Sequence, residues 1–217
     1  MQYTLYKATE SYVRTSSEKK HDLLIKMLSD KIKIPKETNY SLMLGQALEL
    51  IPKLSSKHIN ILSLETIFTS LQLESLKSIE LPRDEEKFKQ VFNNIFKFVD
   101  KFEITIHDIN YLTNYGIGTF LLGDKLDELL INNYPNMFDT DNSNQLMNET
   151  RYANINGERV SVREYVESLD QRYRKIFYVF DDLGLYYLNI SPIAEIIGLL
   201  NYSIITKDII HLNKMYS

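Results

Sequence analysis

The chain has 217 residues, a formal net charge of −4 at pH 7 and no cysteine. The lack of cysteine excludes disulfides, thiolate metal sites and cysteine nucleophiles, and the acidic balance disfavours nucleic-acid binding by the whole surface. The hydrophobic fraction of 44% is ordinary for a globular protein, whereas only 7 glycines and 5 prolines disfavour an all-β fold with its many tight turns.

The apolar pattern gives no sign of secretion or membrane insertion. Residues Met1–Thr4 lack the basic region and the apolar run of a secretory signal. No segment approaches the roughly 18 uninterrupted apolar residues of a membrane span. We therefore expect a cytoplasmic protein with no membrane partner.

Three helices are expected in the first third of the chain. Thr15 and Glu18 have the spacing of a capping box, which predicts a helix that runs to about Lys33. Apolar residues at alternating spacings of four and three predict two further helices, over residues 39–54 and 55–71.

A strongly amphipathic helix is predicted next, after an acidic first turn at Asp84–Glu86. Five aromatic residues lie between Phe88 and Phe102, which indicates that this helix belongs to the core. Thr105 is then expected to cap a short helix that ends near Tyr115.

The segment 116–123 is the richest in glycine, and it invites comparison with phosphate-binding loops. The dinucleotide fingerprint requires a third glycine where Leu121 stands, and a P-loop requires Lys followed by Ser or Thr where Asp124 stands. We interpret the segment as a packed turn or short strand.

Asp124 is predicted to start a helix that ends near Asn133. A polar loop, rich in Asn and Asp, follows over residues 134–150, and it departs from a calcium loop at the required Gly and Glu positions. The dipeptide Asn156-Gly157 predicts a hairpin within residues 151–160.

The clearest signals lie between residues 161 and 202. Ser161 is predicted to cap one long helix that runs to Leu183, because apolar residues keep helical spacing throughout. Gly184 suits the end of that helix, residues 185–190 suit a short strand, and Ser191-Pro192 suits the start of a second helix.

Five charged side chains in this region are candidate contacts for a protein partner or for DNA. Arg172, Arg174 and Lys175 form a basic cluster before the expected strand, although five acidic residues share the same helix. Asp181 and Asp182 lie near the helix C-terminus, where the helix dipole disfavours acids. Such acids mark a binding site or are relieved by solvent or a nearby Arg.

No catalytic motif is found. The four histidines show no metal-ligand spacing, and we expect them to have surface or structural roles. We predict no catalytic residues, no metal site and no cofactor.

Two stretches resemble an uncharacterised bacterial family of small helical proteins. The first combines residues 15–18, 22–24, 47–51 and 54–64. The second, Leu183–Leu185 with Leu188–Gly198, is similar to an ending of the type Leu-x-x-Thr/Ser-Pro-x-Gly-x-x-Ile-Gly, with Ala194 in place of the usual Gly. The resemblance implies a part in antiphage defence and supplies no catalytic residue.

The sequence thus predicts a mostly α fold, a multi-helix bundle or stacked helical hairpins with a small C-terminal helix–strand–helix (winged-helix-like) module. The expected domains are a bundle over residues 1–133, a polar linker over 134–160 and the module over 161–217. We expect a non-enzymatic interaction or regulatory component that docks on a protein partner or a second copy, with the loop 134–150 ordering on contact. A winged-helix DNA-binding regulator is the alternative, and a hydrolase built from scattered acids and histidines is a third hypothesis.

Overall fold

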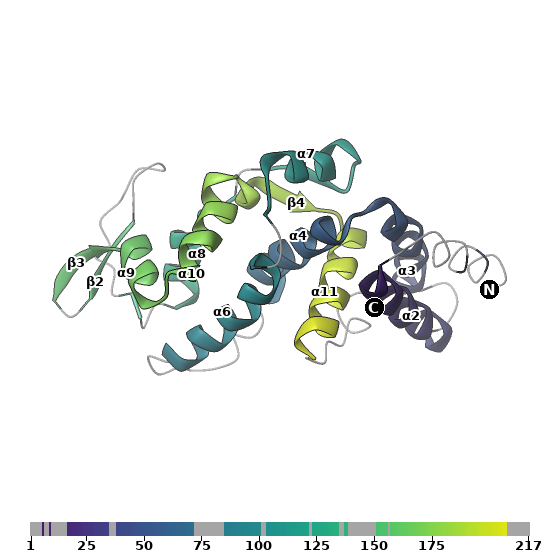
Figure 1. Ribbon diagram of the computed structural model, residues 1–217, viewed down its shortest axis with the longest axis horizontal. Coiled ribbons are helices and arrows are strands. Elements are labelled where there is room, and N and C mark those ends of the chain that lie inside the picture. Colours follow the sequence, from purple (N-terminus) through teal and green to yellow (C-terminus); the bar gives the residue numbers. More distant parts are fainter. Residues whose placement is uncertain are drawn as a thin grey trace. The chain divides into compact units, whose positions relative to one another are not determined.

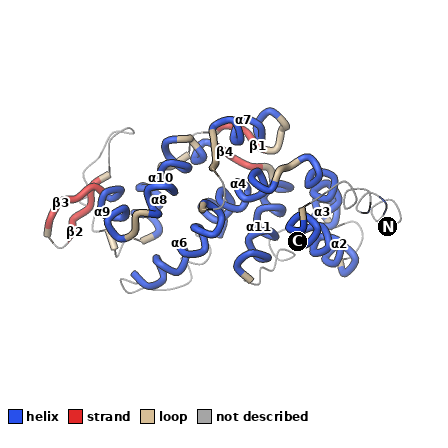
Figure 2. Tube along the Cα trace, in the orientation of Figure 1, coloured by secondary structure: helices blue, strands red, loops and turns tan. Residues whose placement is uncertain are grey.

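The computed structural model is mostly helical, with short strands in two-stranded antiparallel sheets (Figures 1 and 2). It describes residues 6, 9, 17–34, 38–71, 85–100, 103–121, 123–134, 137–138, 151–155 and 157–207. The predicted mostly α class is confirmed. Within the described part of the chain, no helix is long and apolar enough to cross a membrane.

The chain forms two compact units, and each is assembled from separate segments. Unit 1 comprises residues 1–66, 107–119 and 189–217, and unit 2 comprises residues 67–106 and 120–188. These are not the contiguous ranges that the sequence predicts. In particular, the segment 161–217 is divided between the two units after Leu188.

Unit 1 is mostly helical. Its elements are α2 (Glu18–Lys33), α3 (Asn39–Leu50), the short 3-10 helix η1 (Ile51–Lys53), α4 (Ser56–Thr66), α7 (Ile106–Asn114) and α11 (Pro192–Thr206). Ser191 caps α11 by accepting the backbone N–H of Ala194, as predicted. Thr15 lies outside the described residues, and Ser17 stands at the N-cap of α2.

Helix α11 packs against α4, α3 and α2 and completes the core of unit 1. Gly198 makes the close approach to α4 possible. A Cβ built on Gly198 would lie 2.5 Å from Thr66 Oγ1 and 2.6 Å from the carbonyl oxygen of Leu62. Ala194, which stands where the resembled family has Gly, is fully buried in the same helix.

Polar side chains are buried along this helix contact. Asn201 Nδ2 donates to Ser63 Oγ at 2.8 Å and to Asn60 Oδ1 at 3.3 Å. Ser63 Oγ in turn donates to the carbonyl oxygen of Gly198 at 3.0 Å. Because buried polar groups are costly unless they are paired, these bonds favour one alignment of α4 against α11.

His58 forms a capping box at the start of α4, with imidazole in the place usually taken by Glu or Gln. Ser55 Oγ accepts the backbone N–H of His58 at 3.1 Å, and His58 Nδ1 accepts the backbone N–H of Ser55 at 3.3 Å. The imidazole stacks on Tyr111 with a centroid distance of 4.2 Å, and its Nε2 lies 3.6 Å from Asp108. This is a structural role, as the sequence predicts for the histidines.

Unit 2 contains a strongly amphipathic helix, α6, and a β-hairpin. Its elements are the π-helical segment η2 (Ile67–Leu71), α6 (Glu85–Val99), α8 (Leu126–Asn133), β2 (Tyr152–Ile155), β3 (Glu158–Ser161), α9 (Val162–Leu169), α10 (Arg172–Phe177), the π-helical segment η3 (Tyr178–Asp182) and the 3-10 helix η4 (Leu185–Tyr187). Strands β2 and β3 pair antiparallel around Gly157, whose φ is 88°, so the predicted hairpin is confirmed.

Aromatic side chains fill the core of unit 2. Tyr173 of α10 lies 5.6 Å from Phe88, 5.0 Å from Phe92 and 5.1 Å from Phe96, measured between ring centroids. Phe88 and Phe92 are fully buried. The aromatic residues of α6 therefore have the core position that the sequence predicts.

The predicted single helix from Ser161 to Leu183 is wrong, although its cap is right. Ser161 Oγ accepts the backbone N–H of Glu164, but α9 ends at Leu169 and a new helix starts after an extended Asp170. Asp170 Oδ1 accepts the backbone N–H of Arg172 at 2.8 Å, which caps α10 in the manner of an N-terminal Asp.

Two of the four points at which the chain passes between the units lie in strands. Strand β1 (Gly118–Phe120) pairs with β4 (Leu188–Ile190), and the chain passes from one unit to the other within each of them. Gly184 has the predicted left-handed conformation, with φ 77°. The predicted strand 185–190 is shorter than expected, because its first half is the 3-10 helix η4.

Replacing Gly198 by Ala tests the helix contact in unit 1. We expect Gly198→Ala to lower the free energy of unfolding by about 1–3 kcal/mol, since the new Cβ collides with α4. Urea unfolding followed by circular dichroism measures this change. In the control Gly45→Ala, the Cβ would meet only the flexible end of Lys31, and stability should hold or rise. Equal stability of Gly198→Ala and the wild type would contradict the packing.

The His58 capping box predicts a pH dependence. Burial lowers the pKa of His58, and this effect outweighs the opposing effect of Asp108. Just below the ordinary His pKa, the unfolded chain therefore binds more protons than the native state. The free energy of unfolding should consequently fall as the pH drops through that range. Gln can accept the same N–H without titrating, so His58→Gln should lose less stability than the wild type between pH 7 and pH 5. If the wild type and His58→Gln lose the same stability between pH 7 and pH 5, the capping role of His58 is contradicted.

Candidate functional site

A surface groove in unit 2 brings together side chains from two helices and a π-helical segment. Its volume is about 570 Å³. Three basic, two acidic and two neutral polar side chains line it, namely Arg163, Arg174 and Lys175, Glu167 and Asp182, and Gln171 and Tyr178.

The groove follows from two interruptions of regular helix. The first is the extended residue Asp170, which separates α9 from α10. The second is η3, where the N–H of Leu183 bonds to the carbonyl oxygen of Tyr178, five residues earlier, at 2.8 Å. Single π-turns of this kind are frequent at functional sites.

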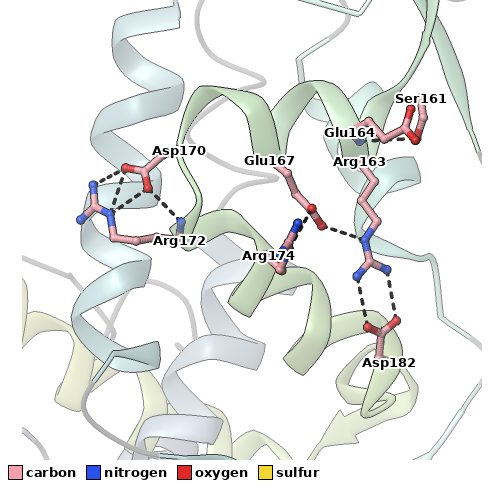
Figure 3. Close-up of polar contacts among 8 residues, drawn as sticks. All are labelled: Ser161, Arg163, Glu164, Glu167, Asp170, Arg172, Arg174 and Asp182. Atoms are coloured by element: carbon pink, nitrogen blue, oxygen red, sulfur yellow. Dashed lines mark hydrogen bonds and ion pairs between the residues drawn. The ribbon is translucent and has the colours of Figure 1, made fainter.

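Arg163 joins α9 to η3. Its Nη1 and Nη2 donate to the two carboxylate oxygens of Asp182, each at 3.1 Å, in a bidentate pair. Its Nε donates to Glu167 Oε1 at 3.0 Å, and its guanidinium lies 5.2 Å from the ring centre of Phe177. Figure 3 shows Arg163 between the two carboxylates. The hydrogen bond with Asp182 is the main cause that raises the pKa of Arg163.

Arg174 extends the same network toward solvent. Its Nε donates to Glu167 Oε2 at 3.3 Å (Figure 3). Only 18% of the Glu167 side chain is exposed, against 80% for Arg174. Within the described part of the chain, the terminal nitrogens of Arg174 and the ammonium of Lys175 have no recorded acceptor.

The predicted basic cluster is divided by the fold. Arg174 and Lys175 line the groove, whereas Arg172 binds Asp170 and lies over the ring of Phe96, 4.1 Å from its centre. The bonds from Arg172 lower the pKa of Asp170. Arg172 is therefore engaged in capping α10 and covering the aromatic core.

The two adjacent acids also have different surroundings. Asp182 lines the groove and is relieved by Arg163, one of the outcomes that the sequence left open. Asp181 Oδ1 accepts the backbone N–H of Leu126 at 2.9 Å and so caps α8. Helix α8 consequently begins at Leu126 and not at the predicted Asp124.

The cap at α8 places two carboxyl groups in a poorly solvated region. Burial raises the pKa of Asp181 to about 6, and the neighbouring Asp127 adds to this effect. Burial also raises the pKa of Asp127, although that side chain accepts the backbone N–H groups of Glu128 and Arg151. Asp181 is thus a half-buried structural acid outside the groove lining.

Four groove residues were absent from the predicted contacts, namely Arg163, Glu167, Gln171 and Tyr178. Arg163 and Glu167 both lie in α9. Their spacing of four residues is the signal that could have found them, because it allows an ion pair along one helix. The bond between Arg163 and Asp182 spans 19 residues and has no local signal.

The described residues contain no group of three or more histidine or acidic side chains that could hold a metal ion. The calcium-like sequence at 139–150 and His211 lie outside the described residues. Most of the loop 134–150 also lies there.

The fold is mostly helical, and charged side chains line the groove of unit 2. The chain belongs to an uncharacterised protein family, whose model matches residues 1–216. No curated protein and no solved structure matches the chain.

Asp181 predicts a second pH dependence, opposite in sign to that of His58. Its pKa of about 6 exceeds the ordinary value of 3.8, so the native state binds more protons between these values and stability falls as pH rises. Asp181→Asn keeps an acceptor for Leu126 and does not titrate. The free energy of unfolding of this variant should therefore equal that of the wild type near pH 4. Near pH 7 it should be higher than that of the wild type, by at most about 3 kcal/mol.

Urea unfolding at both pH values measures this difference. The neighbouring variant Asp182→Asn is the control, and it should be less stable than the wild type at pH 7 because it loses the pair with Arg163. Identical pH profiles for the wild type and Asp181→Asn would contradict the buried cap.

Proposed function

We propose that this protein is a non-enzymatic interaction component, and that it recognises a partner protein or a second copy of itself through the groove of unit 2. The observation that carries the proposal is the pair of exposed side chains Arg174 and Tyr178 on the groove lining, with exposed fractions of 80% and 47%. Arg and Tyr dominate binding hot spots, because they combine apolar area with hydrogen-bonding groups.

The ion pairs within the groove also support binding. Glu167 holds Arg174 at Nε, and Arg163 holds Glu167 and Asp182. Side chains that are already ordered lose less entropy when a partner binds. The oxygens of the two carboxylates serve these ion pairs, which favours a recognition surface over a reaction centre.

Duplex DNA is the second candidate occupant, because three basic side chains line the groove. Two observations favour a protein instead. The carboxylates of Glu167 and Asp182 stand among those basic groups, and Arg172 is engaged by Asp170.

The proposal extends to a cytoplasmic accessory subunit or sensor of a bacterial antiphage defence assembly. This extension rests on the family resemblance of the sequence. In such an assembly, the groove would be the surface that other subunits contact.

Site-specific cross-linking tests the proposed surface. A photoreactive amino acid in place of Tyr178 should cross-link the protein, in cells, to one discrete partner or to a second copy. Light scattering of the purified protein distinguishes the second copy by its mass. Adding Arg174→Glu should weaken the cross-link, because it removes a central hot-spot side chain.

Tyr152 of β2 is the matched control position, since its exposed fraction of 42% is close to that of Tyr178. The same photoreactive group at Tyr152 should give no discrete product. Equal cross-linked products from both positions would overturn the proposed surface. So would the lack of any product from Tyr178 if the purified protein also has a monomeric mass.

A further inference from the structure

We propose that the occupant of the groove is an acidic segment of a partner protein, whose carboxylates bind Arg174 and Lys175. This inference rests on the proposed function and names the chemistry of the partner. It follows from the donors and acceptors that the groove leaves available.

The acidic side chains of the groove are already engaged. Glu167 Oε1 and Oε2 accept from Arg163 and Arg174, and the two oxygens of Asp182 both accept from Arg163. Arg163 in turn uses all three of its guanidinium nitrogens in these bonds. The network therefore neutralises most of its own charge and leaves few sites for a ligand.

The groups that remain are donors. Arg174 is bound only through Nε in the described part of the chain, so its two terminal nitrogens are accessible. Lys175 is the next residue and lines the same groove. Three basic and two acidic side chains line the groove, so its net charge is positive. This positive charge lies on Arg174 and Lys175, and an anionic group would complement it.

The geometry of Arg174 selects a carboxylate well. A guanidinium whose Nε is held presents its terminal N–H groups as a planar edge, which binds a carboxylate with two parallel hydrogen bonds. Tyr178 lines the same groove, and its aromatic ring can cover the apolar part of a peptide.

A nucleic acid fits the same groove less well. A phosphate backbone is a continuous polyanion, and it would bring charges close to Glu167 and Asp182 as well as to the two available cations. A peptide can place single carboxylates at Arg174 and Lys175 and neutral residues elsewhere. The observations therefore favour an acidic peptide segment.

Fluorescence anisotropy with the purified full chain tests the inference. The probe is a labelled oligo-glutamate peptide, compared with oligo-glutamine and with an oligo-thymidylate of equal charge. The wild type should bind oligo-glutamate best, and added salt should weaken the binding because the contacts are exposed.

The variant Arg174→Glu/Lys175→Glu should lose about tenfold or more in affinity for oligo-glutamate. The matched control is Lys97→Glu/Arg159→Glu, which changes net charge equally at exposed positions of unit 2 outside the groove. The affinity of this control for oligo-glutamate should fall by less than about twofold. Arg174→Lys, which keeps the charge and loses the planar edge, should fall between the two. Circular dichroism checks that each variant is folded.

Three outcomes would overturn the inference. The first is that the wild type does not bind oligo-glutamate. The second is that the groove variant and its control lose equal affinity for oligo-glutamate. The third is that oligo-thymidylate binds more tightly than oligo-glutamate and that its binding depends on the groove. A Tyr178 cross-link that depends on Arg174, found without oligo-glutamate binding, would leave the proposed function standing and reject only the acidic partner. Absence of a Tyr178 cross-link together with a monomeric mass would reject the proposed function itself, whatever the result with oligo-glutamate.

Discussion

The candidate site depends on one guanidinium group. Arg163 binds Glu167 within its own helix and Asp182 nineteen residues later, so it fixes the end of η3 against α9. Exposed ion pairs are usually worth less than about 1 kcal/mol, but a bidentate pair with about a third of the Arg163 side chain exposed has the geometry that makes such a pair effective. Without Arg163, Asp182 would carry an unrelieved charge near a helix C-terminus, and Glu167 would no longer be shared between two arginines.

Local chemistry made much of the fold predictable. Ser161 and Ser191 each accept a backbone N–H three residues later, and Gly184 is left-handed, as the sequence predicts. The break after α9 was missed because the apolar stripe keeps helical spacing across it, from Val166 to Tyr173. Periodicity reports which face is buried and says little about whether the backbone is continuous. The capping preference of Asp170 was the only local sign of the break.

The ion pair between Arg163 and Asp182 could not be predicted from the sequence, for a different reason. Asp182 could be suspected as an acid in an unfavourable place, but its partner Arg163 is distant in the chain and is ordinary in composition. Long-range pairs of this kind are fixed by the tertiary fold. The same holds in unit 1, where Ser63 and Gly198 meet across 135 residues.

The division of unit 1 into three chain segments has a consequence for its synthesis. Helices α2, α3 and α4 leave the ribosome early, but α11, which packs against all three, is made more than a hundred residues later. Until then, the buried polar residues Asn60 and Ser63 lack the partners that α11 supplies, and the apolar faces of the early helices remain uncovered. The nascent protein must therefore carry an incomplete first unit while unit 2 emerges, a state in which chaperones and early binding partners would have their greatest influence.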